Sequence, residues 1–182
     1  MTKLTWKKWT PHLGYDQTLK MHMDSLPGNA SSEISWMVKL LENPESPVAL
    51  PGAISLERHD AIHIIIGRGL LPQDEAAVIG FTMGTCDNLN KLHLLIFKFA
   101  VRFIYPKVYQ FDKELLKVFD LWVEAGKRSK CKEINNYLFE NNTLKTIDDI
   151  RQELGITNEL LEEYYAKEKE LAPNTTASKR LA

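Results

Sequence analysis

The sequence predicts an all-α protein, a single compact domain of about six to seven helices. Apolar residues recur at helical spacing along the chain, and no alternating apolar run bounded by turn residues predicts a strand. Of the 182 residues, 44% are hydrophobic and 26% are charged, which is typical of a globular chain with a sizeable core. We expect an irregular N-terminal lead at 1–30, a helical domain at 31–172 and a flexible tail at 173–182.

The first half of the chain predicts three helices. Residues 32–42 carry an apolar stripe at helical spacing and end at an Asn-Pro pair. A second helix is expected at about 53–66, where the Gly-Arg-Gly triplet at 67–69 stops it. A third begins at Pro72, a good first-turn residue, and runs towards Met83.

The second half predicts further helices. Residues 91–105 are apolar around most of the helix circumference, so we expect this helix to be the most buried one. Asp112 is expected to cap a helix that runs to Ala125 and is closed by Gly126. Shorter helices are expected around 134–139, 146–155 and 157–171.

Charge and composition exclude several classes of function. The 23 basic and 24 acidic residues give a formal net charge of -1, which disfavours nucleic-acid binding. Cys86 and Cys131 form no CxxC pair, so we expect two reduced thiols. We find no signal peptide and no transmembrane segment, and expect a protein that is cytoplasmic or peripheral on the inner face of a membrane.

The chemistry-bearing motif is His59-Asp60-x-x-His63, followed after eleven residues by Glu75. Residues 59 and 63 lie one turn apart on the same helix face, so both imidazoles can reach one ion. The Gly-Arg-Gly turn lets the chain reverse, and Glu75 arrives in the first turn of the next helix, where a carboxylate can close the site from the opposite wall.

Two imidazoles and one or two carboxylates suit a divalent metal ion, zinc first, with iron, cobalt, manganese or magnesium as alternatives. Fewer than six protein ligands leave a position for substrate. We therefore predict that the domain at 31–172 binds metal. Each residue also has an ordinary explanation. His63 is surrounded by isoleucines and suits a core, Asp60 can pair with a neighbouring base, and Glu75 suits the helix dipole.

These residues resemble a known family. The run HDAIHIIIGRGLLPQDE is similar to the His-Asp-x-x-His-x11-Glu signature of the ubiquinone (coenzyme Q) biosynthesis protein 4 family. Trp122 with Gly126, and later Leu144, Arg151, Leu154, Gly155 and Ile156, resemble the C-terminal pattern of that family. The resemblance covers roughly residues 50–156.

The resemblance implies an all-α fold in which His59, Asp60, His63 and Glu75 hold a divalent metal and carry the chemistry. It implies a polyprenylated hydroxybenzoate substrate that loses its C1 carboxylate, coupled in some descriptions to oxidation at that carbon. It also implies peripheral membrane contact and association with other quinone-biosynthesis enzymes, and a homodimer stays open. Asp60 is either a fourth ligand or a partner that orients an imidazole.

Two alternatives remain at this point. The chain can be a non-catalytic scaffold that binds an isoprenoid lipid and organises partner enzymes. It can also be a His-Asp-type metal phosphohydrolase, for which His22 and Asp120 are the only loose candidates for the further ligands. The apolar helix at 91–105 is a candidate wall for a polyprenyl tail, although core packing is the ordinary explanation. The tryptophans at 6 and 9 either seat at a bilayer or pack in the core, and we favour the core.

Overall fold

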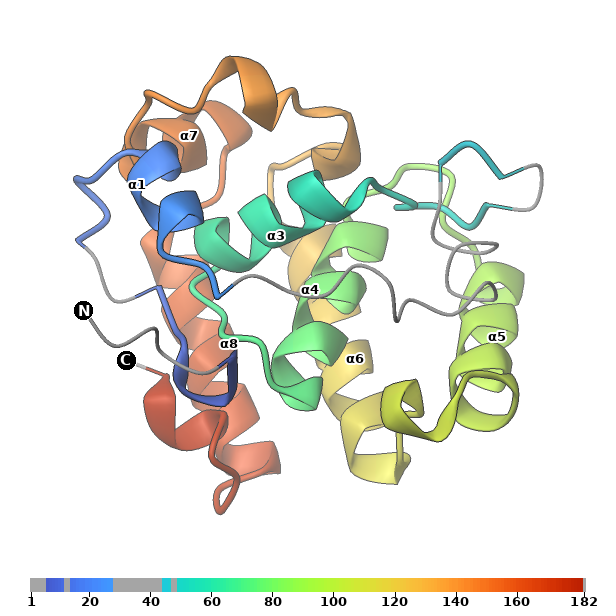
Figure 1. Ribbon diagram of the computed structural model, residues 1–182. Coiled ribbons are helices and arrows are strands. Elements are labelled where there is room, and N and C mark those ends of the chain that lie inside the picture. The colour runs from blue at the N-terminus through green and yellow to red at the C-terminus, as the bar shows by residue number, and fades with distance from the viewer. Residues whose placement is uncertain (1–5, 12–13, 28–43, 47–48, 182) are drawn as a thin grey trace.

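The computed structural model describes residues 6–11, 14–27, 44–46 and 49–181 (Figure 1). This part of the chain is all-α and compact, and it contains no strand, as the sequence predicts. Its α-helices are α1 (Leu19–Asp24), α3 (Leu56–Ile65), α4 (Pro72–Gly84), α5 (Lys91–Phe99), α6 (Lys113–Arg128), α7 (Ile147–Leu154) and α8 (Asn158–Leu171). The helix expected at 32–42 lies outside the described residues.

Several helices begin and end where their cap residues predict. The side chains of Asp112, Thr146 and Thr157 each accept a hydrogen bond from the backbone amide three residues later, at 2.9, 3.1 and 3.2 Å. These bonds satisfy amides that have no partner inside the helix. Gly155 ends α7 with a φ of 68°, in the left-handed region that glycine adopts without steric cost.

Helices α4 and α6 pack more closely than any other helix pair in the described fold, because glycines line their contact. A Cβ atom on Gly80 would lie 2.5 Å from the carbonyl oxygen of Phe119, and one on Gly126 would lie 2.8 Å from the Cα atom of Gly84. The prediction that Gly126 closes its helix is therefore wrong. The helix runs on to Arg128, and the glycine lets the backbone of α4 approach.

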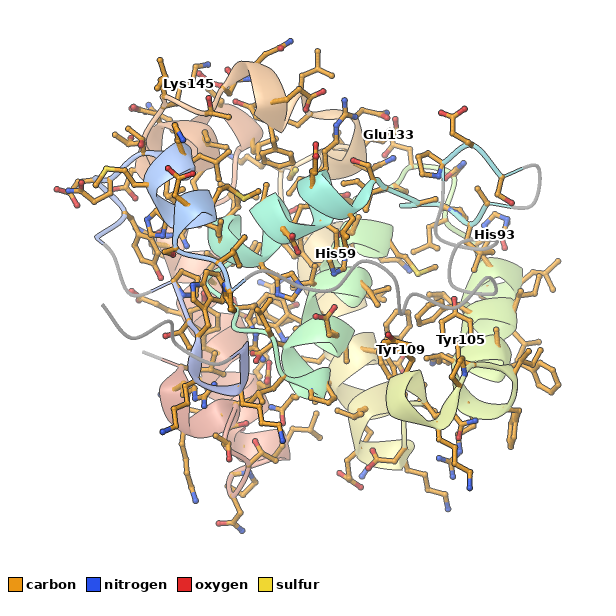
Figure 2. All side chains as sticks on the ribbon, viewed as in Figure 1. His59, His93, Tyr105, Tyr109, Glu133 and Lys145 are labelled. Carbon is orange, nitrogen blue, oxygen red and sulfur yellow. The ribbon has the colours of Figure 1, made fainter. Side chains whose placement is uncertain are left out.

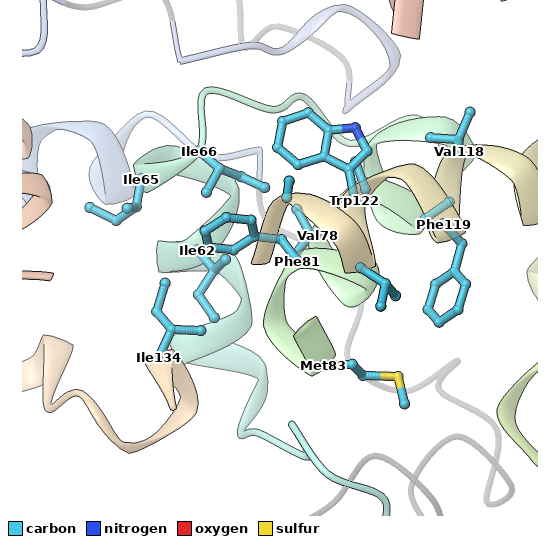
Figure 3. Close-up of a cluster of buried hydrophobic side chains, with 14 of the residues drawn as sticks. Ile62, Ile65, Ile66, Val78, Phe81, Met83, Val118, Phe119, Trp122 and Ile134 are labelled. Atoms are coloured by element: carbon cyan, nitrogen blue, oxygen red, sulfur yellow. The ribbon is translucent and has the colours of Figure 1, made fainter. Parts of the chain in front are cut away.

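The core fills the space between α3, α4 and α6 (Figure 3). Ile62 and Ile66 from α3 and its C-terminal end meet Phe81 of α4 and Trp122 of α6, and all four side chains are fully buried. The ring centroids of Phe81 and Trp122 lie 6.2 Å apart in an edge-on arrangement. This packing holds α3 and α4 in a fixed relation, which matters because both carry site residues.

The prediction that residues 91–105 form the most buried helix is wrong. The segment is helical, as α5 followed by a π-helical turn at Ala100–Ile104, but one side is open to solvent. We call this side the α5 face, and it comprises Leu92, Leu95, Ile96, Phe99, Phe103 and Ile104. Leu95 is 65% exposed and Phe103 is 68% exposed, so solvent contact is substantial. No helix in the described ranges is long and apolar enough to cross a bilayer.

The N-terminal lead is more ordered than the sequence suggests. Helix α1 lies within it, and the amide of Leu19 donates to the carbonyl of Lys145 at 2.9 Å, which ties the lead to the segment before α7. Trp9 is fully buried, and its Nε1 donates to Ser25 Oγ at 3.2 Å. Core packing is therefore confirmed for Trp9, whereas the side chain of Trp6 lies outside the described part.

The C-terminal segment also packs, where a flexible tail was expected. A short 3-10 turn covers Ser178–Arg180, and Ser178 and Leu181 are buried. Gln73 of α4 donates to Ser178 Oγ at 2.9 Å, and Arg180 donates to the carbonyl of Lys7 at 2.6 Å. The small polar residues of this segment predicted a flexible chain end. These two hydrogen bonds instead join the segment to α4 and to the N-terminal lead.

Candidate metal centre

The candidate site lies between α3 and the first turn of α4, and Figure 2 labels its outermost histidine, His59. The turn after α3 brings the two walls together. Gly67 adopts a φ of 66°, and the amide of Arg68 donates back to the carbonyl of His63 at 2.7 Å. This bond closes the helix and reverses the chain, as the Gly-Arg-Gly triplet predicts. Glu75 then faces the histidines from α4.

Three side chains converge there. His59 Nε2 lies 2.9 Å from Glu75 Oε2, His63 Nε2 lies 3.4 Å from Glu75 Oε1, and the two Nε2 atoms are 3.1 Å apart. Ligand atoms about 2.05 Å from a tetrahedral zinc ion are separated by about 3.3 Å. These three spacings, which join the two Nε2 atoms and the two carboxylate oxygens of Glu75, are close to that value, so the arrangement suits a small cation. The expected meeting of His59, His63 and Glu75 is confirmed.

The orientation of His63 also fits a ligand. Its ring is fully buried, and Nδ1 lies 2.6 Å from the backbone carbonyl oxygen of Gly69. A carbonyl oxygen only accepts hydrogen bonds, so Nδ1 carries the proton. The neutral imidazole then has its lone pair on Nε2, the atom that faces His59 and Glu75.

The carboxyl group of Glu75 favours its ionised form. Burial acts to raise its pKa, but the two neighbouring imidazoles, His63 first and then His59, outweigh burial and hold the pKa well below its ordinary value. The side chain keeps 35% of its surface exposed, against 15% for His59 and none for His63. The open side of the site is therefore on Glu75, which is where water or a substrate can enter.

Asp60 does not join the three-residue group. The ligand atoms of His59, His63 and Glu75 all lie within 4.8 Å of one another, and that set excludes Asp60. Its carboxyl group is nevertheless close enough to interact with both imidazoles. Burial raises the pKa of Asp60, and attraction to His59 and His63 offsets part of the rise. The geometry favours Asp60 as a neighbour of the ligands over Asp60 as a fourth ligand.

No family model, curated protein or solved structure matches this chain. The site must therefore be judged on its own geometry. That geometry does not bring in the further residues that a His-Asp phosphohydrolase needs. His22 is buried with Nε2 beside the carbonyl of Gly14, and Asp120 pairs with Lys98 at 2.7 Å. Within the described ranges neither belongs to a metal-ligand cluster.

The Gly69 carbonyl is the part of the site that sequence reasoning missed. The Gly-Arg-Gly triplet predicts a helix stop, and backbone carbonyls carry no sequence signal of their own. Glycine at position 69 allows a close approach. A Cβ atom there would lie 2.8 Å from the carbonyl oxygen of Trp9 and 3.0 Å from Asp74 Oδ2. The second glycine of the triplet is therefore required by packing next to the site.

Proposed function

We propose that this protein is a metal-dependent decarboxylase of quinone biosynthesis that acts on a polyprenylated hydroxybenzoate. The convergence of two imidazole nitrogens and a carboxylate on one point carries the proposal. The resemblance of residues 50–156 to the ubiquinone biosynthesis protein 4 family supplies the substrate class. We propose zinc as the ion, with iron, cobalt, manganese and magnesium as candidates to be tested against it.

The ligand residues have distinct tasks in this proposal. His59, His63 and Glu75 would hold the ion, which when bound would supply a Lewis acid for negative charge that develops on the substrate. The bond between C1 and the carboxylate breaks, carbon dioxide leaves, and the electron pair left at C1 takes up a proton from water. Asp60, next to the imidazoles, attracts them electrostatically, and we propose that it helps to orient His59.

A measurement of bound metal tests the proposal. Purified protein is expected to contain close to one divalent ion per chain, and Glu75→Gln and His63→Ala to lose it. His93→Ala is the matched control, because it removes a histidine on α5 outside the ligand cluster. Carbon dioxide release from a prenylated hydroxybenzoate should stop when a chelator removes the ion. Retained metal and undiminished turnover in the Glu75 variant would refute the proposal.

A second candidate function is a lipid-binding scaffold, and the α5 face favours it. Six large apolar side chains there are exposed, and exposed apolar patches commonly mark contacts with lipid or protein. Residues 88–111 contain Lys91, Lys98, Arg102 and Lys107 but no acidic residue. We propose that this face contacts an anionic membrane surface, from which a prenylated compound is collected. Partner enzymes and a second copy of the chain are the competing occupants.

Vesicle binding separates these possibilities. The protein is expected to sediment with phosphatidylcholine vesicles that contain phosphatidylglycerol, and Leu95→Gln or Phe103→Ser should weaken this binding. Leu144→Ser is the matched control, because Leu144 is 78% exposed and lies outside the α5 face. Lipid binding without carbon dioxide release would favour the scaffold over the enzyme. Equal sedimentation of all variants would remove the α5 face from the proposal.

A further inference from the structure

A charged cluster is buried beneath the candidate metal centre. The guanidinium of Arg68 is fully buried and pairs with Glu168 of α8, which is also fully buried. Nη1 donates to Glu168 Oε2 at 3.0 Å and Nη2 donates to Oε1 at 2.7 Å. Trp122 Nε1 and Gln73 Nε2 donate to the same carboxylate. Each of the two carboxylate oxygens of Glu168 therefore accepts hydrogen bonds from two donors.

Stability alone is a weak explanation for this cluster. Removing two charges from water is costly, and apolar replacements of similar volume are often as stable. A buried ion pair with two parallel hydrogen bonds provides a defined geometry, because the planar guanidinium donates both bonds in fixed directions. The location of Arg68 shows which groups that geometry fixes.

On the α3 side, two backbone groups at Arg68 and Gly69 form hydrogen bonds with His63. The backbone amide of Arg68 donates to the carbonyl of His63 at 2.7 Å. The carbonyl of the next residue, Gly69, lies 2.6 Å from His63 Nδ1. The acceptor that sets the tautomer and the ring angle of His63 therefore belongs to the residue directly after Arg68.

On the α4 side, the same guanidinium pairs with Asp74. Arg68 Nη2 lies 3.0 Å from Asp74 Oδ1, and Asp74 Oδ2 accepts a hydrogen bond from the amide of Leu71 at 2.9 Å. Asp74 directly precedes Glu75, so Arg68 also restrains the helix turn from which Glu75 reaches the histidines. One side chain thus links both walls of the site.

We propose that Arg68, held by Glu168, is a positioning residue for the metal centre. It fixes the Gly69 carbonyl, and through it His63, relative to the first turn of α4. This inference rests on the proposed function only in taking His59, His63 and Glu75 as metal ligands. The competing explanation is that the pair stabilises the fold without any effect on the site.

The test is Glu168→Gln, which keeps the size of the side chain but removes its charge. The matched control is Phe119→Leu, a substitution in the fully buried core on α6 outside the charged cluster. Cobalt affinity, the cobalt absorption spectrum and thermal unfolding are measured for both variants. The tautomer of His63 is read by nitrogen-15 NMR in metal-free protein. Arg68→Lys, which keeps the charge but loses the planar fork, is the milder second variant if Glu168→Gln fails to fold.

We expect Glu168→Gln to bind cobalt about 10- to 100-fold more weakly than the wild type, as for other residues that orient metal ligands. The cobalt spectrum should change, and metal-free His63 should lose its single Nδ1-protonated tautomer. Phe119→Leu should lower the unfolding temperature and leave all three site measurements unchanged. Unchanged cobalt affinity and an unchanged tautomer in a destabilised Glu168→Gln would overturn the inference. A wild type that binds no metal would instead refute the proposed function, and the tautomer would still decide the role of Arg68.

Discussion

Gly126→Ala tests the contact on which the placement of α4 depends. A methyl group at this position would lie 2.8 Å from Gly84 Cα and also strike the carbonyl of Phe81. Carbon atoms in ordinary contact are about 3.5–4.0 Å apart, so the two helices must separate by about 1 Å. Overpacking of this kind costs about 1–3 kcal/mol, while alanine in a helix gains about 1 kcal/mol over glycine. We expect a net loss of up to about 2 kcal/mol.

Denaturant and thermal unfolding measure this loss. For a chain of this size, a net loss of up to about 2 kcal/mol lowers the unfolding temperature by up to about 8 °C. Lys127→Ala, at the exposed neighbouring position, is the control and should change stability by less than about 0.5 kcal/mol. A Gly126→Ala variant more stable than the wild type by the propensity gain would show that α4 and α6 do not meet as described.

Three further predictions concern the site, the thiols and the C-terminal segment. Asp60→Asn should retain metal with affinity lowered about 10- to 100-fold, and complete loss in metal titrations would make Asp60 a ligand. Burial raises the pKa of Cys86 to about 11 and that of Cys131 to about 12, so both thiols should resist alkylation at neutral pH until the protein unfolds. Because the unfolded thiols ionise at their lower ordinary pKa, stability should fall in alkaline unfolding curves as pH rises towards these values, and a flat curve would contradict this. Truncation after Thr176 should lower the free energy of unfolding by about 2 kcal/mol, since it removes buried Leu181, and an unchanged denaturation midpoint would show that the segment does not pack.

The features that sequence predicts correctly here are local ones. A cap such as Asp112 or Thr157 acts on amides within its own helix turn, and Gly155 acts through its own backbone angles. The meeting of His59 and His63 follows from one helix turn. The position of Glu75 could also be predicted, because the short turn between α3 and α4 allows few directions for α4.

The features that sequence misplaces depend on distant parts of the chain. Gly126 alone predicts a helix end, and only the position of α4 shows that the glycine serves a close helix contact. The apolar residues of α5 predict a buried helix, but the other helices leave one side of α5 exposed. Spacing also leaves the role of Asp60 undecided, because the direction of its carboxyl group depends on neighbouring side chains. The pairing of Arg68 with Glu168 has no sequence signal, since no pattern links residues so far apart.

The separation between Arg68 and Glu168, 100 residues, has a consequence for how the protein matures during synthesis. The ribosome makes both walls of the candidate metal centre long before it makes the carboxylate of Glu168 that pairs with Arg68. A nascent chain that already displays His59, His63 and Glu75 thus lacks this carboxylate. Under the proposed function, loading with metal should therefore be a late event that follows docking of α8.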